Sequence, residues 1–196
     1  MNRKVTPKVK NGLVQKKNNH SKTKGAYNHD GSELLIFKYK ALKNYSHVVS
    51  VSDLHKFISI FPDFKKYSEG LHSIILDGSF HSPMGLCEIG VISLMAWEKD
   101  SFDDPDSCPD WLEEHKDVLT TLGVEFSIEN KYSYFTKKTA RDFMLIHVFV
   151  HEIGHHYDRW CTYSKNSFPG GEPFAENFAN NLFDEIWPKY QDIFYK

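Results

Sequence analysis

The sequence predicts one α+β domain, in which a small, twisted and mostly antiparallel sheet packs on a long helix and a second, glutamate-bearing helix follows. Short apolar segments separated by turn residues occupy residues 34–135. Residues 138–160 lack proline and hold one glycine across about six helical turns. Residues 173–187 form a second helical segment between Gly170 and Pro188. The length of 196 residues and the 40% hydrophobic composition fit one domain with a hydrophobic core.

Charge divides the chain into a predicted tail, residues 1–32, and a folded domain, residues 33–196. Residues 1–29 contain eight Lys or Arg and no Asp or Glu, and the remaining 16 basic and 26 acidic residues leave the rest at a net charge of −10. Such a tail can bind nucleic acid or an acidic membrane surface. Its scarcity of aromatic residues and of apolar periodicity favours a solvated, disordered arm instead.

The composition also bears on the compartment. No apolar run approaches the roughly 18–20 residues of a membrane span, and the basic N-terminus is not followed by the apolar stretch of a secretory signal peptide. The three cysteines form no CxxC pair, which fits a reducing compartment. We therefore expect a cytoplasmic protein without a membrane span.

The elements follow from apolar patterns and from the residues that interrupt them. The expected strands are residues 34–39, 47–51, 71–76 and 86–97, the last with a bend at Gly90, and a hairpin of residues 124–128 and 132–135. Ser52 or Asp53 caps a helix through Ile60, and Pro62 ends it. Residues 98–110 are acidic and contain proline, so they are expected to form an exposed loop. The later helices are expected at residues 110–122, 138–160 and 173–187, with Pro188 as the stop of the last.

One helical stretch carries residues with metal chemistry, His151-Glu152-Ile153-Gly154-His155. The two imidazoles lie one turn apart on one helix face, so both can bind one Zn²⁺ ion. Glu152 is about 100° around the helix from His151, near enough to contact a metal-bound water. Zinc lowers the pKa of such a water towards about 7, which makes Glu152 the candidate general base. Burying these groups on an apolar helix without a metal or hydrogen-bonding partners would be costly.

The third protein ligand must come from elsewhere, because catalytic zinc sites usually have three. Glu172 and Glu176 lie four residues apart at the start of the next helix. One would bind the metal, and the other would hydrogen-bond a ligand histidine. Because Glu172 precedes Pro173, helical geometry is disfavoured for it, and Glu176 supported by Asn180 remains a rival ligand.

The chain resembles the gluzincin branch of the zincin metallopeptidases, and most closely catalytic domains similar to anthrax lethal factor, in two motifs: His151-Glu152-x-Gly154-His155-x-x-Asp158 and Glu172-x-Phe174-Ala175-Glu176-x-Phe178. The resemblance covers about residues 138–183. It implies a zincin-like fold and zinc-dependent hydrolysis of peptide bonds. It also implies that Glu172 is the zinc ligand and that Glu176 supports the site.

Other side chains near the motif are candidates for further roles. His156, Tyr157 and Tyr163 could donate a hydrogen bond to the oxyanion of a tetrahedral intermediate. His147 lies one turn before His151 on the same face, where a packing role is favoured over a catalytic one.

Two classes of function fit these observations. The first is a zinc metallopeptidase whose peptide or protein substrate pairs with an edge strand within residues 86–97. The second is a non-proteolytic binding or regulatory protein of zincin fold, acting through its basic tail or an interaction surface, against which the intact Glu152 argues. A deformylase-like amidase would use a cysteine ligand, but the residues around Cys87 do not match that pattern. No motif states a cleavage preference or an oligomeric state.

Overall fold

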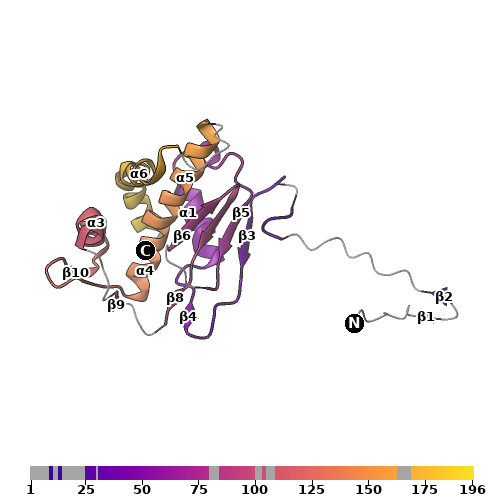
Figure 1. Cartoon of the computed structure of the whole chain (residues 1–196), viewed down its shortest axis with the longest axis horizontal. Helices are drawn as coiled ribbons and strands as arrows, with labels where there is room; N and C mark the ends of the chain where they lie inside the picture. Colours follow the sequence, from indigo (N-terminus) through magenta and orange to yellow (C-terminus); the bar gives the residue numbers. More distant parts are fainter. Residues whose placement is uncertain are drawn as a thin grey trace.

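The chain forms a four-stranded sheet with helices packed along it (Figure 1). The computed structural model describes residues 9–10, 13–14, 25–29, 31–79, 84–99, 103–104, 109–162 and 169–196. The strands are β1 (Val9–Lys10), β2 (Leu13–Val14), β3 (Leu35–Lys38), β4 (Tyr45–Ser46), β5 (Ser73–Leu76), β6 (Gly85–Glu88), β7 (Val91–Leu94), β8 (Trp97–Glu98), β9 (Asp103–Asp104), β10 (Glu125–Ser127) and β11 (Tyr132–Tyr134). The helices are α1 (Val51–Ile60), α2 (Phe64–Tyr67), α3 (Pro109–Leu122), α4 (Lys137–Phe143), the π-helix η1 (Met144–Val148), α5 (Phe149–Thr162) and α6 (Gly171–Phe194).

The four-stranded sheet is mixed, in the order β3-β5-β7-β6. β3 pairs with β5 and β5 with β7 in parallel, whereas β6 runs antiparallel to β7 at one edge. The coarser prediction of a small sheet combined with several helices is confirmed, but the prediction of a mostly antiparallel sheet is wrong here. The connection from β3 to β5 contains α1 and α2, and such a long crossover lets the chain return in the same direction.

Two further local predictions are wrong because of turn and cap residues. Residues 86–97 form two main strands instead of one, since Gly90 adopts a φ of +71° and the chain reverses between β6 and β7. Residues 47–51 do not form a strand, because α1 already begins at Val51. Its N-cap is Ser50, whose hydroxyl accepts from the Asp53 amide while the Asp53 carboxylate accepts from the Ser50 amide. The β10–β11 hairpin is confirmed, and β9 pairs with its second strand.

The main hydrophobic core lies between the sheet and the helices. Ile74 and Leu76 of β5 and Ile92 of β7 contribute to it from the sheet, and α5 contributes Phe149 and Ile153. Figure 1 shows α5 lying between the sheet and α6, so α5 is covered on two sides. Eight residues of α5 are buried, including the Glu152 carboxylate and His155. The polar residues of this helix are therefore held in a packed environment.

The predicted long helix is confirmed as a continuous rod of α4, η1 and α5, and α6 packs against it. The prediction that Pro188 ends the last helix is wrong, because α6 continues to Phe194. A proline inside a helix costs about 3 kcal/mol, and burial of Tyr190 two residues later helps to offset that cost. None of the helices in the described part of the chain has the length and apolar character needed to cross a membrane.

Residues 25–29 pack on the face of the sheet opposite the main core. Ala26 is buried against Ile75 and Val91, and the Ser73 hydroxyl donates to the Ala26 carbonyl oxygen at 2.7 Å. The packed part of the chain therefore already includes Gly25–His29, which the sequence places in the tail. Of the preceding residues, the structure describes only the short β1–β2 pair.

Candidate metal centre

The rod of α4, η1 and α5 carries the paired histidines. Thr136 caps it, and its hydroxyl accepts from the Thr139 amide at 3.1 Å. Within η1 the chain widens, because the amide of Phe149 donates to the carbonyl of Met144, five residues earlier. Single π-turns of this kind occur frequently at functional sites. α5 then resumes ordinary helical spacing and presents His151 and His155 on one face.

Two imidazole nitrogens and the Glu172 carboxylate converge at the start of α6. His151 Nε2 lies 3.1 Å from His155 Nε2 and 3.1 Å from Glu172 Oε2, and His155 Nε2 lies 3.4 Å from Glu172 Oε1. Ligand atoms at about 2.0–2.1 Å from a tetrahedral zinc ion are about 3.3–3.4 Å apart. The spacing of these atoms therefore matches the ligand set of one zinc ion. The Glu172 side chain is 80% exposed, so this side of the cluster faces solvent.

Glu176 contacts the other nitrogen of His151. Its Oε2 lies 3.2 Å from His151 Nδ1, and its Oε1 accepts from Asn180 Nδ2 at 3.2 Å. The predicted pairing of Glu176 with Asn180 is therefore present. The Glu172 carboxylate contacts the Nε2 atoms of both histidines. The Glu176 carboxylate contacts the opposite ring nitrogen of His151, Nδ1, and so orients that ring. The geometry favours Glu172 over Glu176 as the third ligand.

Both nitrogens of His151 face a carboxylate oxygen. A carboxylate only accepts and a neutral imidazole carries one N–H, so the neutral ring donates to Glu176 or to Glu172 and presents a lone pair to the other. A lone pair facing a carboxylate oxygen requires a cation, either a metal ion or an extra proton. Burial lowers the pKa of His151, but the Glu176 hydrogen bond and the nearby carboxylates outweigh it and raise this pKa overall. The site thus has a net preference for positive charge.

Close packing of α6 on α5 places Glu172 at the histidines. A Cβ atom at Gly154 would lie 3.0 Å from Ala175 Cα and 3.2 Å from the Phe178 side chain, so glycine permits this approach. The start of α6 is held by Asp158, whose Oδ2 accepts from the Gly170 amide at 2.7 Å. Asp158, on α5, therefore anchors the start of α6.

Glu152 is buried between α5 and β6. Burial raises its pKa to about 7; His151 opposes this rise and Glu172 adds to it. A Cβ atom at Gly85 on β6 would come within 2.8 Å of Glu152 Cγ and of Val148 Cγ1, so β6 lies directly against this side chain. A carboxyl group with a pKa near neutrality suits a general base.

Of the predicted oxyanion donors, the two that the structure describes, His156 and Tyr157, make contacts with other residues. The ring of His156 is buried, and its Nε2 lies 2.8 Å from the carbonyl oxygen of Glu69. Tyr157 packs edge-on against Tyr67, with ring centroids 4.9 Å apart. Tyr163 lies outside the described residues. His156 is therefore engaged elsewhere, because a different part of the α5 circumference faces Glu69.

Cys87 is not part of the cluster either. Its thiol is buried on β6 and donates to the carbonyl oxygen of Glu88 at 3.6 Å. Burial, and secondarily the Glu152 charge, raises the pKa of this thiol to about 12, which disfavours the thiolate that a metal ligand needs. Among the described residues that could hold a metal with His151, the carboxylate of Glu172 completes the set.

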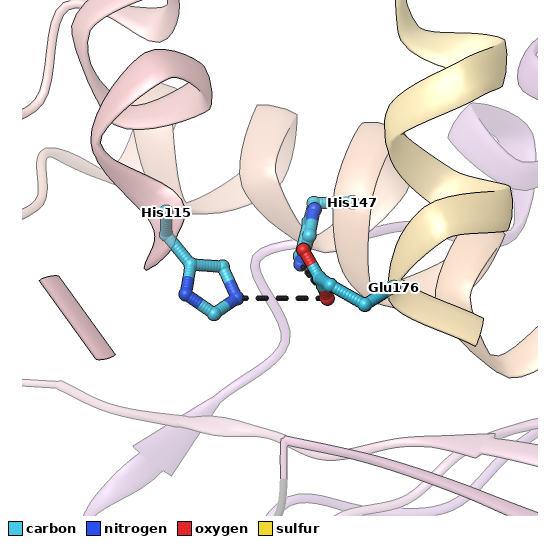
Figure 2. A group of neighbouring side chains, drawn as sticks. All are labelled: His115, His147 and Glu176. Carbon is cyan, nitrogen blue, oxygen red and sulfur yellow. Dashed lines mark ion pairs between the residues drawn. The ribbon is translucent and has the colours of Figure 1, made fainter. Parts of the chain in front are cut away.

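Sequence reasoning missed two features of this region. Gly85 confines Glu152, and a lone glycine in an apolar segment is the signal that marks such a close approach. His115 on α3 and His147 on η1 both approach Glu176 (Figure 2). His115 lies 36 residues before His151 on another helix, and its spacing carries no signal.

Comparison with protein-family models, with curated proteins and with solved structures found no match to this chain.

Proposed function

We propose that the chain is a zinc-dependent metallopeptidase with a zincin-like fold, in which His151, His155 and Glu172 bind the zinc ion. The observation that carries the proposal is the convergence of the two Nε2 atoms and the Glu172 carboxylate at 3.1–3.4 Å. Two imidazoles and one carboxylate are a ligand set of hydrolytic zinc sites. When bound, zinc supplies a Lewis acid that polarises a substrate carbonyl and makes water more acidic.

The surrounding residues have separate tasks in this proposal. Glu152 accepts the proton of the attacking water and returns it to the leaving amine. Its burial excludes bulk water and holds its pKa at about 7. Glu176 fixes the orientation and tautomer of His151 through the 3.2 Å contact with Nδ1. The general base and the group that orients a ligand histidine are thus both supplied by residues next to the three zinc ligands.

The position of β6 supports a peptide as the substrate. β6 is an edge strand, and its free side has no strand partner among the described residues. It lies against Glu152 through Gly85, so an extended chain paired with β6 would pass near the general base. Main-chain pairing binds any extended peptide, and side-chain pockets then set the preference.

A non-proteolytic binding protein that acts through the basic tail is the other class of function. Within the described residues, no contact of comparable specificity favours it. A binding protein of this class would bind nucleic acid, and that binding would require residues 1–24 and weaken steeply as the salt concentration rises.

The first test is the zinc content of the untagged chain together with peptide-library cleavage. His151→Ala and Glu172→Ala are each expected to remove the ion held at His155, lowering the zinc content by one per chain. Glu176→Ala retains the three ligands and is expected to weaken affinity by about 10–100-fold. Chelation should abolish cleavage, and added zinc should restore it. Zinc content is measured by elemental mass spectrometry.

Two results would contradict the proposal. A wild-type chain that takes up no zinc when zinc is supplied would remove the metal site. A chain that binds zinc through His151 but cleaves no member of an extended-peptide library would retain the site and exclude the peptidase.

Gly85→Ala tests the contact between β6 and the general base. The added methyl group would overlap Glu152 and Val148, so the carboxylate must shift away from its present position. We expect kcat to fall by roughly 10²-fold, as misplaced catalytic groups do, with unchanged zinc content. Gly123→Ala is the matched control, because its Cβ meets nothing within 4 Å although its φ of +74° is strained. Equal kcat values for the two variants would show that β6 does not position Glu152.

A further inference from the structure

A second group of metal-ligating side chains lies behind the first. His115 comes from α3, His147 from η1 and Glu176 from α6, and Figure 2 shows both imidazoles directed at the Glu176 carboxylate. His147 Nε2 lies 3.4 Å from Glu176 Oε2, and His115 Nε2 lies 3.9 Å from the same oxygen. One ligand atom from each residue lies within 4.8 Å of the other two. These three atoms do not include the converging nitrogens of His151 and His155.

The surroundings of His115 decide which of its nitrogens faces Glu176 as a lone pair. His115 Nδ1 lies 2.8 Å from the carbonyl oxygen of Trp111, and a carbonyl oxygen only accepts, so Nδ1 carries the hydrogen. In the neutral ring, Nε2 therefore presents a lone pair to the carboxylate. A lone pair on Nε2 is the donor that a metal ion needs from this ring.

Both imidazoles are held by aromatic packing. The His115 ring stacks on Trp111 with centroids 4.5 Å apart, and the His147 ring stacks on Phe143 with centroids 5.1 Å apart. The side chains of His115 and His147 are 8% and 6% exposed, and that of Glu176 is 14% exposed. Packing thus holds the three ligand atoms in a largely buried region, where the Glu176 carboxylate also contacts His151 Nδ1 and accepts from Asn180 Nδ2.

We propose that His115, His147 and Glu176 bind a second divalent transition-metal ion of the zinc class. Two imidazole nitrogens and one carboxylate oxygen form a donor set that suits zinc. The 3.4 Å contact already matches a tetrahedral ion, and the 3.9 Å contact closes with a movement of about 0.5 Å. Water completes the coordination, because the described residues supply these three protein ligands.

The second ion would link three helices that are distant in sequence. α3, η1 and α6 would share one ion, so its binding is expected to stabilise the packing of α3 on the rod. Glu176 would also keep its contact with His151 Nδ1, so the second ion would reinforce the orientation of that ring. The inference concerns metal binding and stability, and it does not require peptidase activity.

The experiment is a cobalt titration of the metal-stripped, untagged full chain, with bound metal counted after gel filtration. Wild type is expected to bind two ions per chain. His115→Gln and His151→Ala are each expected to lose one of the two, and the double variant to lose both. His55→Gln is the matched control, since His55 is an exposed helical histidine, and it should retain two.

Thermal unfolding provides a second readout that does not depend on activity. Added zinc is expected to raise the Tm of His151→Ala, in which only the second site remains, and to leave the His115→Gln/His151→Ala variant unchanged. Should the His115 variant fail to fold, the wild-type stoichiometry still decides the question. One ion per wild-type chain, lost in His151→Ala, would overturn the second site while leaving the first intact. In that case Glu176 would serve only as hydrogen-bonding support for His151, and His147 would only contact Glu176.

Discussion

Glu152→Gln is expected to lower the rate of peptide hydrolysis by about 10²–10⁴-fold, the usual contribution of a general base. Glutamine has nearly the same shape as glutamate, but its amide cannot take a proton from water. Glu152 is not one of the three converging ligands, so the variant should retain its zinc. Replacing a buried, partly protonated carboxyl group by an amide also avoids leaving a charge unpaired. The loss should therefore appear in kcat.

The measurement is steady-state cleavage of a peptide found by library screening, with zinc content determined on the same sample. Glu125→Gln provides the control, since Glu125 is exposed on β10, away from the cluster, and both its kcat and its zinc content should equal those of wild type. A Glu152→Gln variant that keeps wild-type kcat would mean that another group takes the proton.

The histidine pair was predictable because it depends only on helical spacing. His151 and His155 lie on one face of any helix that contains them, whatever packs around it. The choice between Glu172 and Glu176 was not predictable in this way. It depends on the crossing of α6 over α5, which Gly154 and Ala175 set by close contact. Both glutamates reach His151, but they reach different nitrogens.

The fold was predictable in its elements more than in its topology. Strands of four residues, such as β5 and β7, are buried on both faces and carry no alternation that reveals direction or partner. β5 runs parallel to β3 because the chain crosses over through α1 between them. A strand assigned to residues 47–51 hides this crossover from a sequence-based prediction. The approach of His115 to Glu176 depends on where α3 packs, which local patterns do not encode.

Contacts with Asp142 explain why α6 continues past Pro188. The sequence alone does not indicate that Asp142 makes these contacts. Its carboxylate is fully buried and accepts from the Tyr190 hydroxyl at 2.5 Å and the Tyr195 hydroxyl at 2.6 Å. Arg141 adds a contact of 2.8 Å from Nη2. Burial, and then the hydrogen bonds to Asp142, raise the pKa values of both tyrosines far above the usual range, so both hydroxyls remain donors. The last turns of α6 are thus tied to α4.

Asp142→Ala is expected to lower the free energy of unfolding by about 3–5 kcal/mol, because it leaves the Arg141 guanidinium and the Tyr190 hydroxyl without their buried acceptor. Out of a typical total of about 5–15 kcal/mol, this is a large fraction. Urea unfolding measures it, with Asp192→Ala as control, since that carboxylate is 66% exposed and pairs with Lys196, which lies four residues later, beyond the end of α6. The control should change by no more than about 1 kcal/mol. If Asp142→Ala were equally mild, the continuation of α6 beyond Pro188 would have to rest on the apolar packing of Tyr190 alone.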